Sequence, residues 1–393
     1  MNFRILTLLT TVCLFSHILP VGADEVPITE YRFEHVGIND GLNSASVSNI
    51  VQDKHGFLWF ATQSGLNRFD GYSFDRYEHD PFNKNSLSHN LVQTMYYEES
   101  GVLWLGTYGG LNRFDLKSGE FTWYTHASDD PGTLSNNVVV AITRSASGDL
   151  WVGTLKGLNR YDAINNKFVR YMQGDAAQGE LPNDVVRSLA VDKNGTLWVG
   201  TYGGLSRYIE KNDEFETLTP RSENQKGLPS PYVMSILPDP QERNVLWTGT
   251  WDGGVSKINT QTEEVTTYTL PHNEIYVMLF DSNGELWVGT WGNGLYLLNP
   301  TTGQVNRVQT SSNWPVQELS DKVIYSLLED ESGLVWIGTN GGGVFKYVPW
   351  ENSYQSFVHD PNDSSTLSAG KITAIHFDDN GTGWFGTYNG GLN

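Results

Sequence analysis

The residues of this sequence that are best suited to bind a ligand are aromatic side chains next to a repeated motif. Trp-x-Gly-Thr, or a close variant of it, occurs eight times, and the residue that follows it varies. In chain order the variable residue is Gln63, Tyr108, Leu155, Tyr202, Trp251, Trp291, Asn340 and Tyr388. Residues that every repeat shares are needed by each structural unit, so a single binding site is expected where the repeats differ. Aromatic rings can stack on the apolar C–H face of a sugar.

Seven residues at or beside the variable position are candidates for ligand binding. They combine aromatic rings with polar neighbours: Tyr108, Tyr202, Trp251, Asp252, Trp291, Asn293 and Asn340. In a ring of repeats, the turn after each motif opens on one face near the central channel, and these side chains would meet there. The alternative is that they only cap the packing between repeats. The sequence leaves both interpretations open.

Catalysis has little support in the residue types and their spacing. The sequence contains no His-Glu-x-x-His pair, no Gly-x-Ser-x-Gly segment and no glycine-rich phosphate loop. Its 9 histidines lack metal-ligand spacing, and its 45 acidic residues are too numerous to select a general-acid pair. Asp-x-Asn-Gly turns resemble the start of a calcium loop but lack its other ligands, so ordinary turn chemistry explains them better. We therefore expect no catalytic residue, no metal site and no cofactor.

The charge of the chain restricts its partners. Lys and Arg together number 25 and Asp and Glu 45, which gives a net charge of −20. A chain of this sign is poorly suited to a nucleic-acid backbone or to an anionic membrane surface. It suits a soluble domain.

The first 23 residues are typical of a secretory signal peptide. Arg4 is followed by an apolar run over residues 5–19, and small residues precede a cleavage site near Ala23. The run is shorter than the ~20 residues of a membrane span. Cys13, the single cysteine, lies in this segment, so the mature chain has no disulfide and no cysteine nucleophile. We therefore expect an exported chain that makes no membrane contact after cleavage.

The repeated motif also predicts the fold. Its tryptophans are spaced by 40 to 49 residues, at Trp59, Trp104, Trp151, Trp198, Trp247, Trp287, Trp336 and Trp384. Before most motifs come an apolar run and a tight polar turn, and after them come a glycine turn and two more short runs. Val, Ile, Thr and aromatic residues in the runs, with Gly, Asp and Asn between them, indicate strands and turns. Four strands per repeat form one propeller blade, so we predict an all-β β-propeller.

Two residues of each repeat are expected to serve packing. In a strand, residues two apart share a face, so the motif tryptophan and glycine point the same way. We expect the glycine to make room for a bulky neighbour, an indole. The arginines of the Gly-Leu-Asn-Arg-like segments recur, which predicts a structural role for Arg68, Arg113, Arg160 and Arg207.

The blade count has two solutions. Residues 31–36 resemble a lone outer strand, of the kind that closes a propeller by pairing with its last blade. Seven blades fit within residues 31–360, and residues 361–393 would then begin a second propeller that is truncated. The competing count is an eight-bladed ring closed by residues 31–36. The last repeat stops in mid-blade, which indicates a piece of a longer protein.

Residues 40–71, DGLNSASVSNIVQDKHGFLWFATQSGLNRFDG, resemble the two-component regulator propeller repeat. The resemblance extends over about residues 31–393, although the second part of the repeat differs at residues 254–258 and 294–298 and Gly383 replaces Leu or Val. It implies the exported sensor region of a bacterial hybrid histidine kinase or diguanylate cyclase. In that family the order is signal peptide, two seven-bladed propellers, an immunoglobulin-like domain, one membrane helix and a cytoplasmic signalling module.

The resemblance also implies a ligand and a place in the cell. The expected ligand is a small molecule or oligosaccharide, the expected location is the periplasmic face of the inner membrane, and a homodimer would form through the full-length receptor. Kinase and cyclase motifs are absent from the sequence, so the output type stays open. Two other functions remain open, namely a secreted propeller enzyme similar to polysaccharide or streptogramin lyases and a scaffold that binds protein. Sequence beyond residue 393, or a turnover assay on glycans, would discriminate them.

Overall fold

The computed structural model describes residues 28–218, 227–310, 319, 322–348, 359–361, 363, 365–378 and 382–393. The predicted signal peptide, residues 1–23, lies outside the described residues. The described secondary structure is all β, apart from two 3-10 turns, η1 (Ile38–Asp40) and η2 (Ala176–Gln178). Among these residues no helix is long and apolar enough to cross a membrane. The all-β prediction is confirmed.

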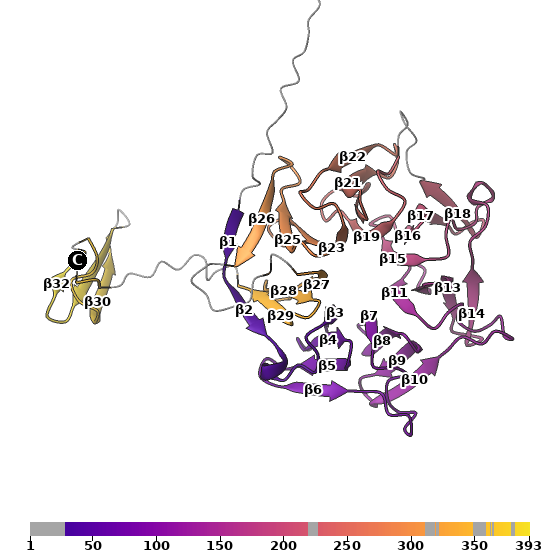
Figure 1. The fold of residues 1–393 in the computed structure, drawn as a ribbon, viewed down its shortest axis with the longest axis horizontal. Coiled ribbons are helices and arrows are strands. Elements are labelled where there is room, and N and C mark those ends of the chain that lie inside the picture. The colour runs from indigo at the N-terminus through magenta and orange to yellow at the C-terminus, as the bar shows by residue number, and fades with distance from the viewer. Residues whose placement is uncertain are drawn as a thin grey trace, which may run out of the picture.

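Seven sheets, which we call blades 1 to 7, are arranged in a ring in the described chain (Figure 1), and we call the centre of this ring the central channel. Their innermost strands are β3 (Val47–Gln52), β7 (Val92–Glu98), β11 (Val139–Arg144), β15 (Val186–Val191), β19 (Val233–Pro238), β23 (Ile275–Phe280) and β27 (Ile324–Glu329). Each contacts the innermost strands of both neighbouring blades, including β27 with β3. The ring is therefore closed, and its seven blades fit the preferred count.

The outer strands of each blade follow in chain order. The second strands, which carry the motif, are β4 (Leu58–Thr62), β8 (Val102–Thr107), β12 (Leu150–Thr154), β16 (Leu197–Thr201), β20 (Val245–Thr250), β24 (Leu286–Thr290) and β28 (Val335–Thr339). The third strands are β5 (Gly65–Phe69), β9 (Gly110–Asp115), β13 (Gly157–Asp162), β17 (Gly204–Ile209), β21 (Gly254–Asn259), β25 (Leu295–Leu298) and β29 (Val344–Tyr347). The fourth strands of blades 1 to 6 are β6 (Phe74–Tyr77), β10 (Glu120–Tyr124), β14 (Lys167–Tyr171), β18 (Glu214–Leu218), β22 (Val265–Tyr268) and β26 (Val305–Thr310).

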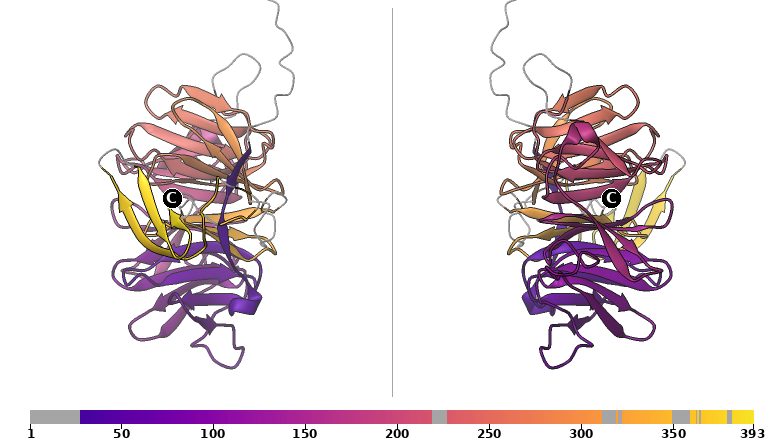
Figure 2. Two further views of the ribbon diagram at one scale, coloured as in Figure 1. Left: turned by 90° about the vertical axis from the view of Figure 1, so that its left-hand side faces the viewer. Right: turned by 90° about the vertical axis from the view of Figure 1, so that its right-hand side faces the viewer.

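The N-terminal segment closes the ring through two strands, and not through the one outer strand that we expected at residues 31–36. β1 (Ile28–Tyr31) pairs in parallel with β26 of blade 6. β2 (Phe33–Val36) pairs antiparallel with β29 and becomes the fourth strand of blade 7. Figure 2, left, shows this indigo segment beside the orange blades. The chain thus ties two neighbouring blades together where the ring ends meet.

The motif tryptophans fill the interfaces between blades. Trp59 packs with Leu103 and Phe114 of blade 2, and the same arrangement continues to Trp336, which packs with Phe60 of blade 1. All seven motif tryptophans of the ring are at most 5% exposed. Each blade is therefore buried on both faces, and the apolar core is divided among the interfaces around the ring.

The motif glycine makes room for the next blade's innermost strand. A Cβ at Gly153 would lie 2.7 Å from Cγ1 of Val186, and one at Gly249 would lie 2.5 Å from Cγ2 of Ile275. The expected bulky neighbour is therefore present, but the prediction of an indole was wrong. Every motif tryptophan of the ring faces the following blade, so no indole of that blade points back toward the glycine.

Each innermost strand of the ring carries a β-bulge at its second residue. In β15, Val186 pairs with Thr201 and Ser188 pairs with Gly200, so Arg187 has no opposing residue. The same register shift occurs in the other six innermost strands. The bulged residues are Ser48, Gln93, Val140, Arg187, Met234, Tyr276 and Tyr325. Because a bulge changes the direction of a side chain, this position can serve the channel instead of the core.

The eighth repeat forms a separate three-stranded sheet. It consists of β30 (Ile372–Phe377), β31 (Gly383–Thr387) and β32 (Gly391–Leu392). The predicted boundary at residue 360 falls between the last ring strand, β29, and β30. Trp384 is 41% exposed, unlike the seven motif tryptophans of the ring. This sheet therefore lacks the burial that the ring blades give one another.

Candidate functional site

The candidate site is a hollow of about 290 Å³ at the mouth of the channel, where the innermost strands begin. Its volume is at the lower end of the range of roughly 300–1,000 Å³ that is common for ligand pockets. Two sets of residues line most of it, the residue after the motif and the bulged residue of the innermost strand. The lining from these sets is Gln63, Tyr108, Tyr202, Trp251 and Trp291, with Ser48, Gln93, Arg187, Met234, Tyr276 and Tyr325.

Four of the predicted aromatic residues therefore meet in one hollow. A backbone hydrogen bond fixes each of them beside an innermost strand, as in Trp251 N–H to the Tyr232 carbonyl at 3.0 Å and Trp291 N–H to the Glu274 carbonyl at 3.0 Å. Tyr108 and Tyr202 make the same bond to the carbonyls of their own blades, at 3.2 Å each. Trp291 is 37% exposed, so its ring is available to a ligand.

The bulged residues extend this aromatic surface, and they were not predicted from the sequence. The ring centroids of Tyr276 and Trp291 lie 5.5 Å apart, and those of Tyr276 and Tyr325 lie 5.4 Å apart. Trp251 continues the cluster, at 5.5 Å from Trp291. One sequence signal could have found them. The bulged residue lies 11 residues before the motif tryptophan (13 in blade 5), and the residue type at this position varies between repeats.

Arg187 is the cation of the channel mouth. Its Nη2 donates to the Tyr276 hydroxyl at 2.9 Å, and its guanidinium carbon lies 5.5 Å from the centre of that ring. The Nε atom is buried and has no hydrogen-bond partner in the described structure. No carboxylate among the described residues forms an ion pair with Arg187.

Tyr325 contributes a neutral hydroxyl to the same hollow. Burial raises the pKa of Tyr325. The neighbouring rings of Tyr276 and Tyr108 raise this pKa further, and Arg187 lowers it. The net direction is upward, so the hydroxyl keeps its proton at neutral pH and can donate a hydrogen bond. The site therefore offers aromatic faces, a hydroxyl donor and a cation side by side.

Asp252 lies in a second hollow that adjoins the first. This second hollow has a volume of about 330 Å³. Tyr202, Met234 and Trp251 line both hollows, and Tyr232 and Asp252 line the second one only. The rings of Tyr202 and Tyr232 meet edge to face at 5.3 Å. A ligand longer than one sugar unit could extend from the channel mouth over this surface.

Two predicted residues do not line either hollow. Asn293 Oδ1 accepts a hydrogen bond from the Tyr296 hydroxyl at 2.6 Å, which fixes the turn after the motif of blade 6. Asn340 Oδ1 accepts from Ser46 Oγ at 2.9 Å and links blade 7 to the start of blade 1. The polar groups that we expected beside the aromatic rings are therefore used within the protein at these positions.

The recurrent arginines and turn aspartates have structural contacts. Arg68 pairs with Asp75 at 2.7 Å and Arg207 with Glu216 at 2.7 Å, both on outer hairpins. In the turn before the motif, Asp192 Oδ1 accepts the backbone N–H of Asn194, and its Oδ2 accepts the indole N–H of Trp198 at 2.9 Å. This turn-to-tryptophan hydrogen bond has counterparts in blades 1, 5, 6 and 7. Among the described residues, no group of three or more His, Cys, Asp or Glu could hold a metal ion.

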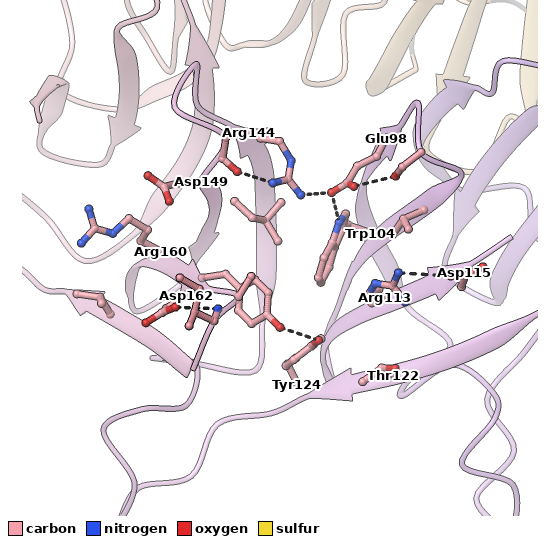
Figure 3. Close-up of a pocket in the computed structure, with 18 residues that line it drawn as sticks. Glu98, Trp104, Arg113, Asp115, Thr122, Tyr124, Arg144, Asp149, Arg160 and Asp162 are labelled. Atoms are coloured by element: carbon pink, nitrogen blue, oxygen red, sulfur yellow. Dashed lines mark hydrogen bonds and ion pairs between the residues drawn. The ribbon is translucent and has the colours of Figure 1, made fainter. Parts of the chain in front are cut away.

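A larger groove of about 800 Å³ lies between blades 2 and 3 (Figure 3). Glu98 accepts the indole N–H of Trp104 at 2.6 Å and also pairs with Arg144. Arg113 pairs with Asp115 at 3.4 Å in the same groove. Its charged groups therefore pair largely with one another, whereas the channel mouth holds a cation without an acidic partner. We consider the channel mouth the better candidate.

Comparison with known proteins connects this ring to a family. A sequence model of the two-component regulator propeller matches residues 41–64, 133–156, 180–203, 269–292 and 318–341. Five segments of the ring thus match the repeat of this family. Each matched segment of these regulator propeller repeats ends two residues after the Trp-x-Gly-Thr motif or its variant, and so includes the variable residue. The family resemblance is thus confirmed.

Solved structures with a similar fold give the context. The extracellular domain of BT3049, described as a hybrid two component system of B. thetaiotaomicron, is 26% identical, with a TM-score of 0.70 over 92% of this chain and 53% of that chain. The extracellular domain of BT4673 from the same organism is also 26% identical, with a TM-score of 0.65 over 90% of this chain and 44% of that chain. The chain therefore spans about half the length of these solved extracellular domains.

Two further comparisons are narrower. Histidine kinase P4 of Formosa agariphila is 49% identical over 49 residues, which are 12% of this chain and 4% of that protein. A streptogramin B lyase is 16% identical, with a TM-score of 0.59 over 80% of this chain and 97% of that chain, and this likeness shows the fold alone.

Proposed function

We propose that this chain is the ligand-sensing part of the ectodomain of a membrane-bound two-component or cyclic-di-GMP signalling protein. Structural neighbours that are 25–26% identical to it are extracellular domains of proteins described as two component systems. This supports an exported sensor, and we place it on the periplasmic face of the inner membrane. The output, a kinase or a cyclase, would lie outside this chain.

We further propose that the channel mouth binds an oligosaccharide. The observation that carries this proposal is the convergence of Tyr108, Tyr202, Trp251 and Trp291 in one hollow. These residues occupy the position that varies between repeats, so the blades do not need them for a common packing purpose. Exposed aromatic faces beside hydroxyl and amide groups match a sugar, which has apolar C–H faces and polar edges.

Signalling would follow from differential binding. A ligand that binds one arrangement of paired ectodomains better than another shifts the population toward the first arrangement. A homodimer of the full-length receptor would provide the two arrangements, and its membrane helix would transmit the change. The channel mouth supplies the binding energy in this scheme and needs no catalytic residue.

Alanine substitution of Trp251 and Trp291 tests the site. We expect Trp251→Ala and Trp291→Ala each to weaken binding of plant or microbial oligosaccharides by at least about tenfold, equivalent to ~1.4 kcal/mol. Isothermal titration calorimetry measures the change. Phe82→Ala is a matched control, because this aromatic residue is 97% exposed in the β6–β7 loop, outside both hollows. Unchanged affinity in both tryptophan variants, with the fold intact, would exclude the channel mouth as the binding site.

The enzyme and scaffold alternatives are tested with the same samples. A sensor binds the oligosaccharide without changing it, whereas a lyase converts it. Product analysis after prolonged incubation therefore distinguishes the two. A scaffold would bind no saccharide at all.

A further inference from the structure

We infer that the channel mouth recognises an anionic group on its saccharide, a carboxylate or a sulfate, through Arg187 and Tyr276. This inference rests on the proposed saccharide site and names the chemical class of its ligand. The first reason is the charge state of the hollow. Arg187 lines it, and no carboxylate in the described structure pairs with its guanidinium.

The second reason is the hydrogen-bonding capacity that is left over. A guanidinium has five N–H donors. In the described structure Arg187 donates to the Tyr276 hydroxyl, while its buried Nε makes no hydrogen bond. The Nη groups of Arg187 are not among the buried atoms without a partner, so a bound oxygen acceptor could reach their remaining N–H donors. A carboxylate or sulfate supplies several acceptors in a planar or tetrahedral group that fits the guanidinium fork.

The third reason is the direction of the Tyr276 hydroxyl. Because this oxygen accepts the hydrogen bond from Arg187 at 2.9 Å, its own hydrogen is free to donate to another acceptor. Tyr325 adds a second hydroxyl, on a ring whose centroid lies 5.4 Å from that of Tyr276. One cation and two hydroxyl donors thus border the same point of the channel mouth, next to Trp291.

Arg187 differs from the recurrent arginines of the third strands. Arg68, Arg113 and Arg207 each pair with a carboxylate on the outer hairpins. In a chain of net charge −20, Arg187 has no carboxylate partner in the described structure, and its printed contacts are with the neutral Tyr276 side chain. Its position at the bulge of β15 directs it toward the channel, where the repeats differ.

The test compares matched saccharides. The first pair is trigalacturonate and its carboxyl-reduced counterpart, in which every carboxylate is a primary alcohol. The second pair is a sulfated disaccharide and its desulfated form. Isothermal titration calorimetry on the full chain gives the affinities, at low and at moderate salt, because salt screens a partly exposed ion pair. We expect at least one anionic sugar to bind at least about tenfold more tightly than its neutral counterpart.

Substitution of the arginine assigns the effect to this site. Arg187→Gln should weaken binding of the anionic sugar about 10- to 100-fold, as expected for loss of a hydrogen bond to a charged group. Binding of the neutral counterpart should change little, and Arg187→Lys should have an intermediate effect. Arg207→Gln is the control, because it changes the net charge equally but lies on an outer hairpin, and it should bind like the unmodified chain.

The outcomes separate this inference from the proposed function. If neutral and anionic sugars bind equally well and Trp251→Ala abolishes both, the saccharide site stands and the anionic preference is overturned. Equal binding of the anionic sugar by Arg187→Gln and the unmodified chain also overturns it. If no saccharide binds, both proposals fail.

Discussion

At the scale of single residues, the turn-to-tryptophan hydrogen bond explains a pattern that recurs along the sequence. The carboxylate of the turn residue accepts a backbone N–H of the tight turn with one oxygen and the indole N–H of the buried tryptophan with the other. Asp192 and Trp198 are an example. Blade 3 is the exception. Ser145 stands at the turn position, and the buried Trp151 Nε1 has no hydrogen-bond partner in the described structure.

Ser145→Asp should therefore stabilise the ring. The new carboxylate can accept the indole N–H of Trp151, because the turn of blade 3 has the same backbone hydrogen bond, Ser145 N–H to the Asp149 carbonyl at 2.9 Å. We expect the free energy of unfolding to rise by about 1–2 kcal/mol. Urea denaturation monitored by tryptophan fluorescence measures it. Ser145→Ala should lower stability instead, and a loss in the aspartate variant would contradict the expected geometry.

The sequence was informative about some site residues and not about others. Tyr108, Tyr202, Trp251 and Trp291 could be predicted because they vary beside an otherwise constant motif. Arg187 was not predicted, because it lies in a run of apolar residues that is typical of an ordinary buried strand. Only the bulge turns it toward the channel, and alternation of side chains does not reveal a bulge.

At the scale of elements, the sequence predicted the four strands of a blade but not how neighbouring blades meet. The spacing of tryptophan and glycine showed that they share a face. Which residue lies opposite the glycine depends on the approach of the next innermost strand, and this is a property of the assembled ring. Val186 is an example, because its Cγ1 would lie only 2.7 Å from a Cβ added at Gly153.

Gly153→Ala should therefore destabilise the protein. The added Cβ would lie 3.2 Å from Ala141 Cβ of its own blade and 2.7 Å from Val186 Cγ1 of blade 4, so blades 3 and 4 would have to move apart. We expect a loss of about 1–3 kcal/mol in the free energy of unfolding. Blade 1 already has Ala61 at this position, so Ala61→Gly is the reciprocal control, with a loss of about 0.5–1 kcal/mol from backbone entropy. Equal effects of the two substitutions would argue against close approach as the cause.

At the scale of the whole molecule, stability depends on the closure by the N-terminal strands. Phe33 of β2 is 1% exposed and packs with Phe345 of β29 and with Leu297 of blade 6. Residues 31–36 were predicted as a single outer strand, because a short apolar segment does not show where it crosses from one blade to the next.

Phe33→Ala should open the ring at the junction of blades 6 and 7. We expect a loss of about 3–5 kcal/mol, as for other truncations of a large buried side chain. Hydrogen exchange should speed up first in β26 and β29, which pair with β1 and β2. Phe168→Ala in blade 3 is the matched control, since this residue is 5% exposed at the interface of blades 2 and 3. Faster exchange at β26 and β29 in both variants would mean that closure is not the local weak point.

The eighth repeat bears on the larger protein. Ile375, Phe377 and Leu392 are each at least 60% exposed in its three-stranded sheet, while the matching faces of the ring blades are buried. The second propeller that the sequence predicts from residue 361 onward stays a prediction. The exposed apolar side chains of this sheet support it, because they need cover that the sheet does not provide itself.

The bulge at the start of every innermost strand separates recognition from folding. Because the bulged residue has no opposing residue in its blade, its side chain can be exchanged without altering the pairing of the strands. The seven bulged positions of this ring share one backbone arrangement but differ in residue type, as Ser48, Val140, Arg187 and Tyr276 show. Relatives of this ring could thus acquire new ligand preferences through substitutions at a few inherited positions, while the blades themselves remain under selection for packing alone.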